Sequence, residues 1–188
     1  MSQLHIHTSE LKEAIPQLRA GDRLLLSGTV YTSRDAAHKR IFSLLDEGKP
    51  LPYPLEGSVI YYAGPTPAQK GMAVGSCGPT TSSRMDPYAP RLLDLGQSIM
   101  IGKGARNQAV KDAVVRNGAV YLAALGGAGA LMAASVRSLE VICWEDLGCE
   151  AVRRLEVKDF PLTVILDAHG GDLYQAGPEA YLAARAGE

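Results

Sequence analysis

Glycine and proline interrupt this sequence so often that only short helices and strands fit between them. The 188 residues include 20 glycines and 11 prolines, and both residue types disfavour the interior of helices and strands. Short apolar stretches alternate with stretches of helical periodicity, without a convincing repeat or a low-complexity linker. The sequence therefore predicts one α/β (mixed α+β) domain that covers residues 1–188.

Local patterns indicate where the individual elements lie. After an extended lead-in, helices are expected where apolar residues recur every three or four positions, and strands where apolar and β-branched residues gather. The expected helices are residues 10–18, 35–48, 85–95 and 105–117, and the expected strands are residues 23–31, 58–62, 98–101, 139–143, 151–157 and 162–167.

Charge and cysteine content argue against several classes of protein. The 19 lysines and arginines against 20 acidic residues leave a net charge of -1, which gives no reason to expect nucleic acid or an anionic membrane as partner. Three cysteines without CxxC spacing argue against a secreted disulfide framework, and the N-terminus lacks the pattern of a signal peptide. We therefore expect a cytoplasmic protein.

Residues 117–136 carry no charge over about the length of a membrane span. The segment consists mostly of alanine and glycine, however, and Gly126, Gly127 and Gly129 interrupt it. These residue types contribute little transfer free energy, and glycine breaks a regular helix. A buried strand, a tight turn and a buried helix fit this segment better than a spanning helix.

Residues 32–39, Thr-Ser-Arg-Asp-Ala-Ala-His-Lys, form the first candidate anion site, at the junction of an expected strand and helix. Free backbone amides at a helix N-terminus attract anions, and Arg34 adds a planar fork that suits a carboxylate. A capped helix with a surface pair between Arg34 and Asp35 explains the same residues. An exposed helical face similarly explains His38 and Lys39.

A run of hydroxyl residues, Thr80 to Ser83, precedes Arg84. Hydroxyls and backbone amides before a helix can hold an oxyanion, and Arg84 offers a second fork for a carboxylate. If a helix begins near Met85, Thr80 and Arg84 are four residues apart and can face one pocket. Thr81 is one residue further along than Thr80, so it would cap the helix or point away from that pocket. A serine- and threonine-rich capping turn explains the run equally well.

Two glycine-rich turns are weaker candidates. Lys103 lies between Gly102 and Gly104 after an expected buried strand, where its ammonium group could approach a ligand. An ordinary turn lysine fits as well, and the remaining residues of a P-loop are absent from the sequence. Residues 126–130, Gly-Gly-Ala-Gly-Ala, could hold a phosphate. Close packing of backbone segments fits them better, because the dinucleotide-binding fingerprint is incomplete.

The cysteines and histidines do not have the spacing of a metal site. Cys77 is far along the chain from Cys143 and Cys149, and the three do not match an iron–sulfur motif. Cys143 lies in an expected apolar strand, which is typical of an inert, buried thiol. Cys77 lies next to the hydroxyl run. His5 and His7 supply two ligands, too few for a zinc site. We expect no metal ligand set within this chain.

Five motifs occur in one order along the chain: SGTVYTSRDAAHKR, YYAGPTP, GSCGPTTSSRMDPY, IGKG and DFPLTVILDAHGGDLY. Together they resemble the β subunit of class I fumarate hydratases and tartrate dehydratases, which are iron–sulfur hydro-lyases. The resemblance covers residues 4–178, and the combination of RDxAHKR, GPTTSxRM and GKG is specific although no single part is. It implies a swivelling β/β/α domain, which we expect here to be a separate small subunit.

The resemblance also implies where the chemistry lies. A [4Fe–4S] cluster would be held by three cysteines of a larger α subunit, in a hetero-oligomer such as α2β2. The cluster would act there as a Lewis acid on a small dicarboxylate substrate. By motif position, Arg34 and Arg84 would bind the substrate carboxylates, Lys103 would add positive charge, and Thr80 would lie near the carbon that gains or loses a proton.

We therefore expect the β subunit of a hydro-lyase that interconverts fumarate and L-malate, or dehydrates tartrate, and is active only with its partner. Fixed cations would stabilise the negative charge that builds up when a proton leaves the carbon next to a carboxylate. A threonine hydroxyl needs an acidic partner for this step, which the resemblance places on the other subunit.

His38 and Thr81 are secondary candidates for the same site. The alternatives are a hydro-lyase for another 2-hydroxy dicarboxylate, such as a methylated malate, and a non-catalytic dicarboxylate-binding or regulatory domain.

Overall fold

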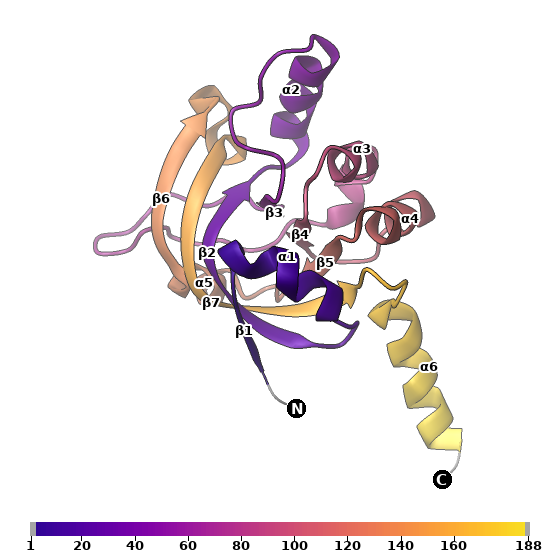
Figure 1. Cartoon of the computed structure of the whole chain (residues 1–188). Helices are drawn as coiled ribbons and strands as arrows, with labels where there is room; N and C mark the ends of the chain where they lie inside the picture. Colours follow the sequence, from indigo (N-terminus) through magenta and orange to yellow (C-terminus); the bar gives the residue numbers. More distant parts are fainter. Residues whose placement is uncertain (1–2, 187–188) are drawn as a thin grey trace.

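The computed structural model describes residues 3–186 and contains a mixed sheet in the order β1-β2-β3-β4-β5-β7-β6. Because β2 also pairs with β7, the strands β2, β3, β4, β5 and β7 close into a five-stranded barrel, with β1 and β6 attached to it (Figure 1). This arrangement confirms the expected mixed α/β class. The strands are β1 (Leu4–His7), β2 (Arg23–Thr32), β3 (Val59–Tyr61), β4 (Ile99–Gly102), β5 (Val120–Ala123), β6 (Val136–Cys143) and β7 (Val152–Leu166).

The long strand β7 closes the barrel. It pairs antiparallel with β2 along one edge, and with β6 and then β5 along the other. The sequence predicted two separate strands, at residues 151–157 and 162–167, and this is wrong. Phe160 and Pro161 continue the pairing with β2, while a bulge in that pairing and a positive φ of 52° at Asp159 absorb the irregularity.

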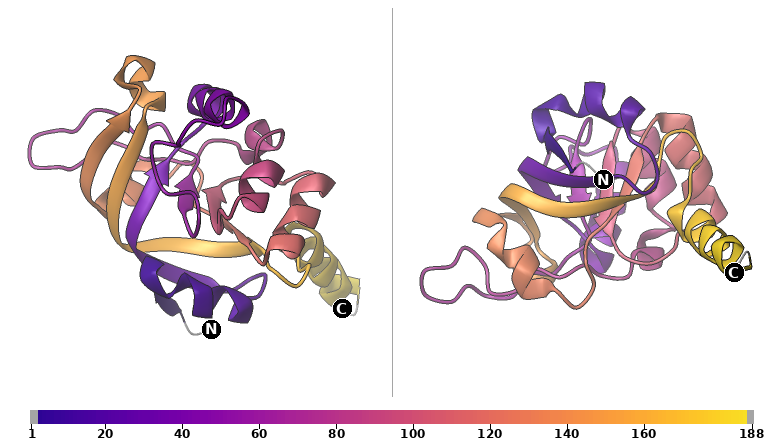
Figure 2. Two further views of the ribbon diagram at one scale, coloured as in Figure 1. Left: turned by 45° about the horizontal axis from the view of Figure 1, so that its top comes forward. Right: turned by 90° about the horizontal axis from the view of Figure 1, so that it is seen from below.

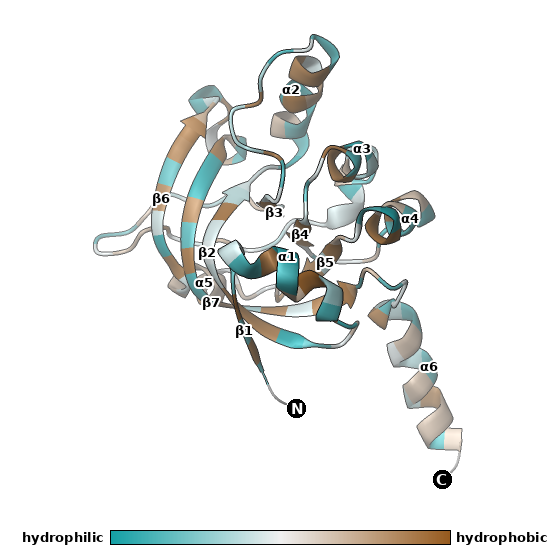
Figure 3. Ribbon diagram, viewed as in Figure 1, coloured by the Kyte–Doolittle hydropathy of each residue, from teal (hydrophilic) through white to brown (hydrophobic). Residues whose placement is uncertain are grey.

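Alternating side chains on the barrel strands separate two hydrophobic cores. Leu26, Ile101 and Leu122 belong to the cluster inside the barrel, whereas Met100 and Tyr121 belong to a second cluster that includes residues of α2, α3 and α4. Figure 3 shows hydrophobic and hydrophilic residues interspersed along β6 and β7, and on β7 buried positions alternate with more exposed ones over much of the strand. The barrel is therefore filled by side chains and covered by helices on one side.

Helices α2, α3 and α4 lie in a row against one side of the barrel, and α6 extends away from it (Figures 1 and 2). Short 3₁₀ segments, labelled η, lie at several junctions. The helical elements are η1 (Thr8–Glu10), α1 (Leu11–Ala14), η2 (Ile15–Gln17), α2 (Asp35–Asp46), η3 (Ser82–Met85), α3 (Ala89–Asp94), α4 (Gln108–Asn117), α5 (Gly129–Ala134), η4 (Glu145–Glu150) and α6 (Leu173–Ala186).

Most of the predicted helices are confirmed in place but are shorter than expected. The helix expected at residues 10–18 is divided between η1, α1 and η2, with Pro16 in the last of these. The helix expected at residues 85–95 starts at Ala89. The helix α4 starts at Gln108 because Asn107 caps it: the Asn107 Oδ1 accepts the N–H of Val110 at 3.0 Å.

The barrel brings several loops to one edge. Strands β2, β3, β4 and β5 are paired parallel to their neighbours, so the loops that follow them leave from the same side. Ligands commonly bind at the carboxyl ends of parallel strands in α/β proteins. Arg34 follows β2, Lys103 follows β4, and the segment containing the hydroxyl run follows β3.

The uncharged residues 117–136 form the end of α4, the buried strand β5, the turn and helix α5, and the start of β6. The short helix α5 is partly buried through Met132 and Ala133. Within residues 3–186, no helix is both long and apolar enough to cross a membrane. The expected buried strand and the turn are thus confirmed, and the expected helix is present but is only partly buried.

Candidate active site

Arg34 lies between β2 and α2, at the capping position of the helix. Its Nε donates a hydrogen bond of 3.1 Å to Oδ2 of Asp35, and its Nη2 lies 3.4 Å from Oε1 of Glu150. Only 18% of the Arg34 side chain is exposed. The pair of Arg34 and Asp35 is therefore present, but it is largely buried and is not the surface pair that the sequence allowed.

Arg84, on η3, reaches the same carboxylate as Arg34. Its Nε lies 2.8 Å from Oδ1 of Asp35, and 51% of its side chain is exposed. Burial would raise the pKa of Asp35, but the hydrogen bond from Arg34 and the positive charges of both arginines outweigh it and hold the pKa below its ordinary value. Asp35 is therefore an anion that holds two guanidinium groups together.

The hydroxyl run starts as extended backbone. The N–H of Thr80 donates to the carbonyl of Tyr62 at 2.6 Å, and Thr81 forms a parallel bridge with Lys103. Helical geometry starts only at Ser82, so Thr80 and Arg84 are not one helical turn apart, and helical spacing does not support placing them in one pocket. Thr81 occupies the capping position, as expected, but its side chain makes no capping hydrogen bond. Thr80 is partly buried and Thr81 is exposed.

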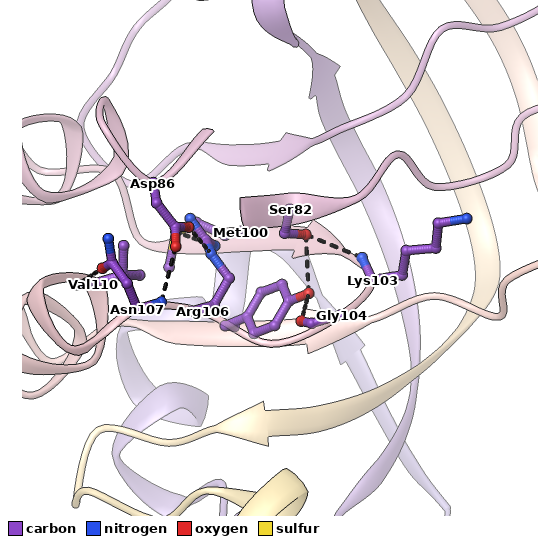
Figure 4. Close-up of polar contacts among 9 residues, drawn as sticks. Ser82, Asp86, Met100, Lys103, Gly104, Arg106, Asn107 and Val110 are labelled. Carbon is purple, nitrogen blue, oxygen red and sulfur yellow. Dashed lines mark hydrogen bonds and ion pairs between the residues drawn. The ribbon is translucent and has the colours of Figure 1, made fainter. Parts of the chain in front are cut away.

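Ser82 has a structural role that the sequence did not indicate. Its buried Oγ accepts the N–H of Lys103 at 3.0 Å (Figure 4). The hydroxyl of Tyr121 lies 2.9 Å from this Oγ and 2.8 Å from the carbonyl of Gly104. A Cβ at Gly102 would lie 2.0 Å from the Ser82 Oγ, so this approach requires glycine. The hydroxyl run and the Gly-Lys-Gly turn are thus packed together.

The side chain of Lys103 extends away from Ser82 and Gly104 (Figure 4). It is partly buried. In the described part of the chain, no carboxylate forms an ion pair with its ammonium group. Within residues 3–186, the positive charge of Lys103 is therefore not neutralised by an ion pair.

A buried ion pair between Arg106 and Asp86 supports the same region, and sequence reasoning missed it. The Arg106 Nε lies 2.6 Å from Oδ1 of Asp86, whose Oδ2 accepts the N–H of Asn107 at 2.8 Å (Figure 4). The guanidinium of Arg106 lies 5.4 Å from the ring of Tyr62 and 5.0 Å from that of Tyr121. This pair connects the residue after η3 to the start of α4. The sequence signal is weak, because the two residues are far apart in the chain and nothing in the motif that contains Asp86 points to Arg106.

His38 is not on the exposed helical face that the sequence suggested. It is fully buried on α2, and its Nδ1 lies 2.9 Å from the Ser33 Oγ. Burial lowers the pKa of His38 to about 4, so the ring is neutral near pH 7. Among residues 3–186 its Nε2 has no hydrogen-bond partner. A neutral, enclosed imidazole supports the turn that carries Arg34 and adds no positive charge to the site.

One part of the glycine-rich turn, Gly129, packs closely against the segment before the hydroxyl run, whereas Gly126 and Gly127 are exposed. The carbonyl of Gly129 accepts the N–H of Cys77 at 3.0 Å. A Cβ at Gly129 would lie 2.3 Å from the Ser76 Oγ, and one at Gly78 would lie 3.4 Å from the Gly129 Cα. The interpretation of close packing therefore holds at Gly129, and it does not hold at Gly127, where a Cβ would have no neighbour within 4 Å.

The three cysteines do not fit an iron–sulfur cluster. Cys77 is buried, and burial raises its pKa to about 12. Cys143 is only partly buried, so it is less enclosed than the sequence suggested, and Cys149 is exposed. Within residues 3–186, no group of three or more histidine, cysteine, aspartate or glutamate side chains is arranged to hold a metal ion.

The fold and these side chains define a small α/β barrel domain with two arginines, a lysine and a hydroxyl run in the loops that follow its parallel strands. The chain belongs to the family described as the fumarase C-terminus, whose model matches residues 1–177. The resemblance seen in the sequence motifs is thereby confirmed.

Named relatives differ in how much of their length this chain covers. It is 41% identical over 169 residues to the aerobic class I fumarate hydratase of Salmonella typhimurium, covering 89% of this chain and 29% of the relative. It is 40% identical over 167 residues to fumarate hydratase 2 of Leishmania major, and the match covers 88% of this chain and 29% of that relative. It is 38% identical over 170 residues to the putative L(+)-tartrate dehydratase subunit beta of Methanocaldococcus jannaschii, covering 87% of both chains. The chain thus spans less than a third of the two fumarate hydratases, and most of the relative named as a β subunit.

Proposed function

We propose that this chain is the β subunit of an iron–sulfur hydro-lyase that hydrates fumarate to L-malate or dehydrates tartrate. In this role it supplies one half of an active site that a larger chain completes. The observation that carries the proposal is the meeting of Arg34 and Arg84 on Asp35, at the loop edge that also holds Thr80 and Lys103. Relatives named as fumarate hydratases and as a tartrate dehydratase β subunit support both substrates.

The cationic side chains suit a dicarboxylate substrate. Arginine binds a carboxylate through two parallel N–H donors, so two arginines match the two carboxylates of fumarate, malate or tartrate. The ammonium group of Lys103 adds a third positive charge without a carboxylate neighbour in the described chain. Fixed cations of this kind stabilise the charge that develops on a substrate carboxylate when the adjacent carbon loses a proton.

Thr80 is the proposed proton-transfer residue, because its backbone is fixed beside β3 while Ser82 is committed to structural hydrogen bonds. A threonine hydroxyl is a weak base, so the step requires an acidic group to activate it. We assign that group to the larger chain. Thr81 is the alternative hydroxyl, and its exposure on the same edge makes it the natural comparison in a mutational series.

We further propose that a larger α subunit carries a [4Fe–4S] cluster on three of its own cysteines, in a hetero-oligomer such as α2β2. The poor fit of Cys77, Cys143 and Cys149 to a cluster supports this division. Anaerobic reconstitution of the chain on its own, followed by iron and sulfide analysis, tests it. The proposal predicts no stoichiometric cluster, and a full cubane on the separate chain would contradict it.

Anaerobic co-expression with the larger subunit tests the function itself. The complex should be assayed with fumarate, L-malate and both tartrate enantiomers, because these substrates share the two carboxylates but differ in hydroxyl groups and stereochemistry. Turnover of at least one of them supports the proposal. A correctly assembled, cluster-loaded complex that binds dicarboxylates without turnover would instead indicate a regulatory domain.

A further inference from the structure

Asp35 is contacted by two arginines that come from different parts of the chain. Its Oδ2 accepts a hydrogen bond from the Arg34 Nε at 3.1 Å, and its Oδ1 lies 2.8 Å from the Arg84 Nε. Each arginine therefore turns its Nε towards the protein. The terminal nitrogens of a guanidinium group can bind a carboxylate as a pair. In the described chain both terminal nitrogens of Arg84 are without an ion-pair contact, whereas Nη2 of Arg34 lies near Glu150 and leaves Nη1 for a ligand.

The two arginines are restrained to different degrees. Arg34 also has Oε1 of Glu150 at 3.4 Å from its Nη2, and its side chain is largely buried. Arg84 is half exposed, and in the part of the chain that the structure describes its ion pair is with Asp35. Asp35 therefore sets the position of the more exposed arginine relative to the more buried one.

Helix capping alone does not explain these contacts. An acidic residue in the first turn of a helix stabilises the helix dipole without any arginine. At the start of α2, Oε2 of Glu150 already accepts the N–H of Ala36 at 2.7 Å. A local helix-stabilising role for Asp35 would also not require contact with Arg84, which lies far away in the sequence.

We propose that Asp35 is a positioning residue that fixes the spacing of the Arg34 and Arg84 guanidinium groups, and thereby sets the length of dicarboxylate that the site accepts. The inference rests on the substrate-binding role proposed above for these two arginines. In this role Asp35 acts through the arginines that its two oxygens contact, because its negative charge would repel a substrate carboxylate.

The test measures the dissociation constants of succinate and glutarate, four- and five-carbon dicarboxylates, for the anaerobic complex with the larger subunit. The unsubstituted complex should prefer succinate. Asp35→Asn keeps the size of the side chain but offers one acceptor oxygen in place of two. We expect it to weaken succinate binding about tenfold, and glutarate binding much less, so that the preference is reduced.

Two further variants separate positioning from loss of structure. Asp35→Glu keeps the charge and both oxygens but moves them outward, so it should restore much of the affinity while shifting the preference towards another length. Asp46→Asn is the matched control: Asp46 is the last residue of α2 and forms an exposed ion pair with Arg91. It should leave both dissociation constants unchanged.

The ratio of the two dissociation constants is decisive, because partial unfolding lowers the bound fraction for both ligands equally. An unchanged ratio in Asp35→Asn would overturn the inference. If that variant does not assemble, an unchanged ratio in Asp35→Glu would overturn it in the same way. A wild-type complex that binds succinate without turning over fumarate, malate or tartrate would count against the proposed function, while the ratio would still decide the role of Asp35.

Discussion

Arg34 and Arg84 are bound to different oxygens of one carboxylate, that of Asp35, at 3.1 Å and 2.8 Å. One arginine follows β2, and the other lies on η3, after β3. Their meeting depends on the parallel pairing of β2 and β3, which brings the ends of both strands to one edge of the barrel. The proposed role of these two arginines, recognition of a dianion, has consequences that can be measured.

Replacing either arginine with lysine should lower kcat/KM of the complex strongly. Arg34→Lys and Arg84→Lys keep the charge but lose the paired donors. The loss of one charge-assisted hydrogen bond costs about 1.5–3 kcal/mol, or about one to two decades in kcat/KM. Steady-state kinetics give the values, with Arg91→Lys as the control, because Arg91 pairs with Asp46 on the surface. Wild-type kinetics in both site variants would show that these arginines do not bind substrate.

Thr80→Ala should lower kcat while substrate binding survives, because the arginines remain. Acid–base groups contribute about 10²–10⁴-fold to rate, and Thr80→Ser should keep much of the activity since the hydroxyl is retained. Kinetics of alanine variants at positions 80 to 83 locate the active hydroxyl. A large loss of kcat in Thr81→Ala, with Thr80→Ala near normal, would move the assignment by one residue. If none of the four matters, the run is a structural turn.

Tyr121→Phe should destabilise the chain by about 1–3 kcal/mol, since it removes a buried hydroxyl that lies within hydrogen-bond distance of Ser82 and Gly104. Burial raises the pKa of Tyr121, so the hydroxyl stays protonated at ordinary pH. Urea unfolding of the variant and of Tyr181→Phe, a control on the exposed face of α6, measures the effect. Equal stability of the two variants would show that the hydroxyl does not hold the two loops together.

His38 should make the free energy of unfolding depend on pH between about 6.5 and 4. Its pKa is lowered from 6.5 to about 4 by burial, so in this window the unfolded chain binds a proton that the folded chain does not. Stability therefore falls as the pH falls, by about 2 kcal/mol between pH 6.5 and pH 5 from this residue. Urea unfolding at both pH values should show a smaller fall in His38→Gln. An equal fall in both proteins would mean that His38 titrates normally.

The sequence predicts the class of fold and most of its elements, because apolar periodicity records which faces are buried. It divides β7 wrongly, since Asp159 and Pro161 disfavour a strand locally while pairing with β2 maintains it. It also places His38 on an exposed face. The sequence of one helix does not show which side chains pack against it, and in the structure the His38 ring centroid lies 5.7 Å from that of Tyr62 and 5.4 Å from that of Tyr88. Tertiary contacts override the local preference in both cases.

In the candidate site too, the sequence indicates the residues but not how they are arranged. Arg34, Arg84 and Lys103 are recognisable from residue type and motif, because the chemistry of a dianion calls for fixed cations. Their arrangement is not recognisable, since the shared contact with Asp35 depends on residues far apart in the sequence. The structural role of Ser82 is equally hidden, because a hydroxyl within a hydroxyl run carries no sign of the Tyr121 that it contacts.

The central claim, that this chain holds one half of an active site, is tested most directly by titration. Increasing amounts of the chain are added anaerobically to a fixed amount of the cluster-loaded larger subunit, and the rate of the hydration or dehydration reaction is followed. The account predicts no turnover by either chain alone and a rate that rises until the two are equimolar. Turnover by the larger subunit alone that this chain leaves unchanged would contradict it.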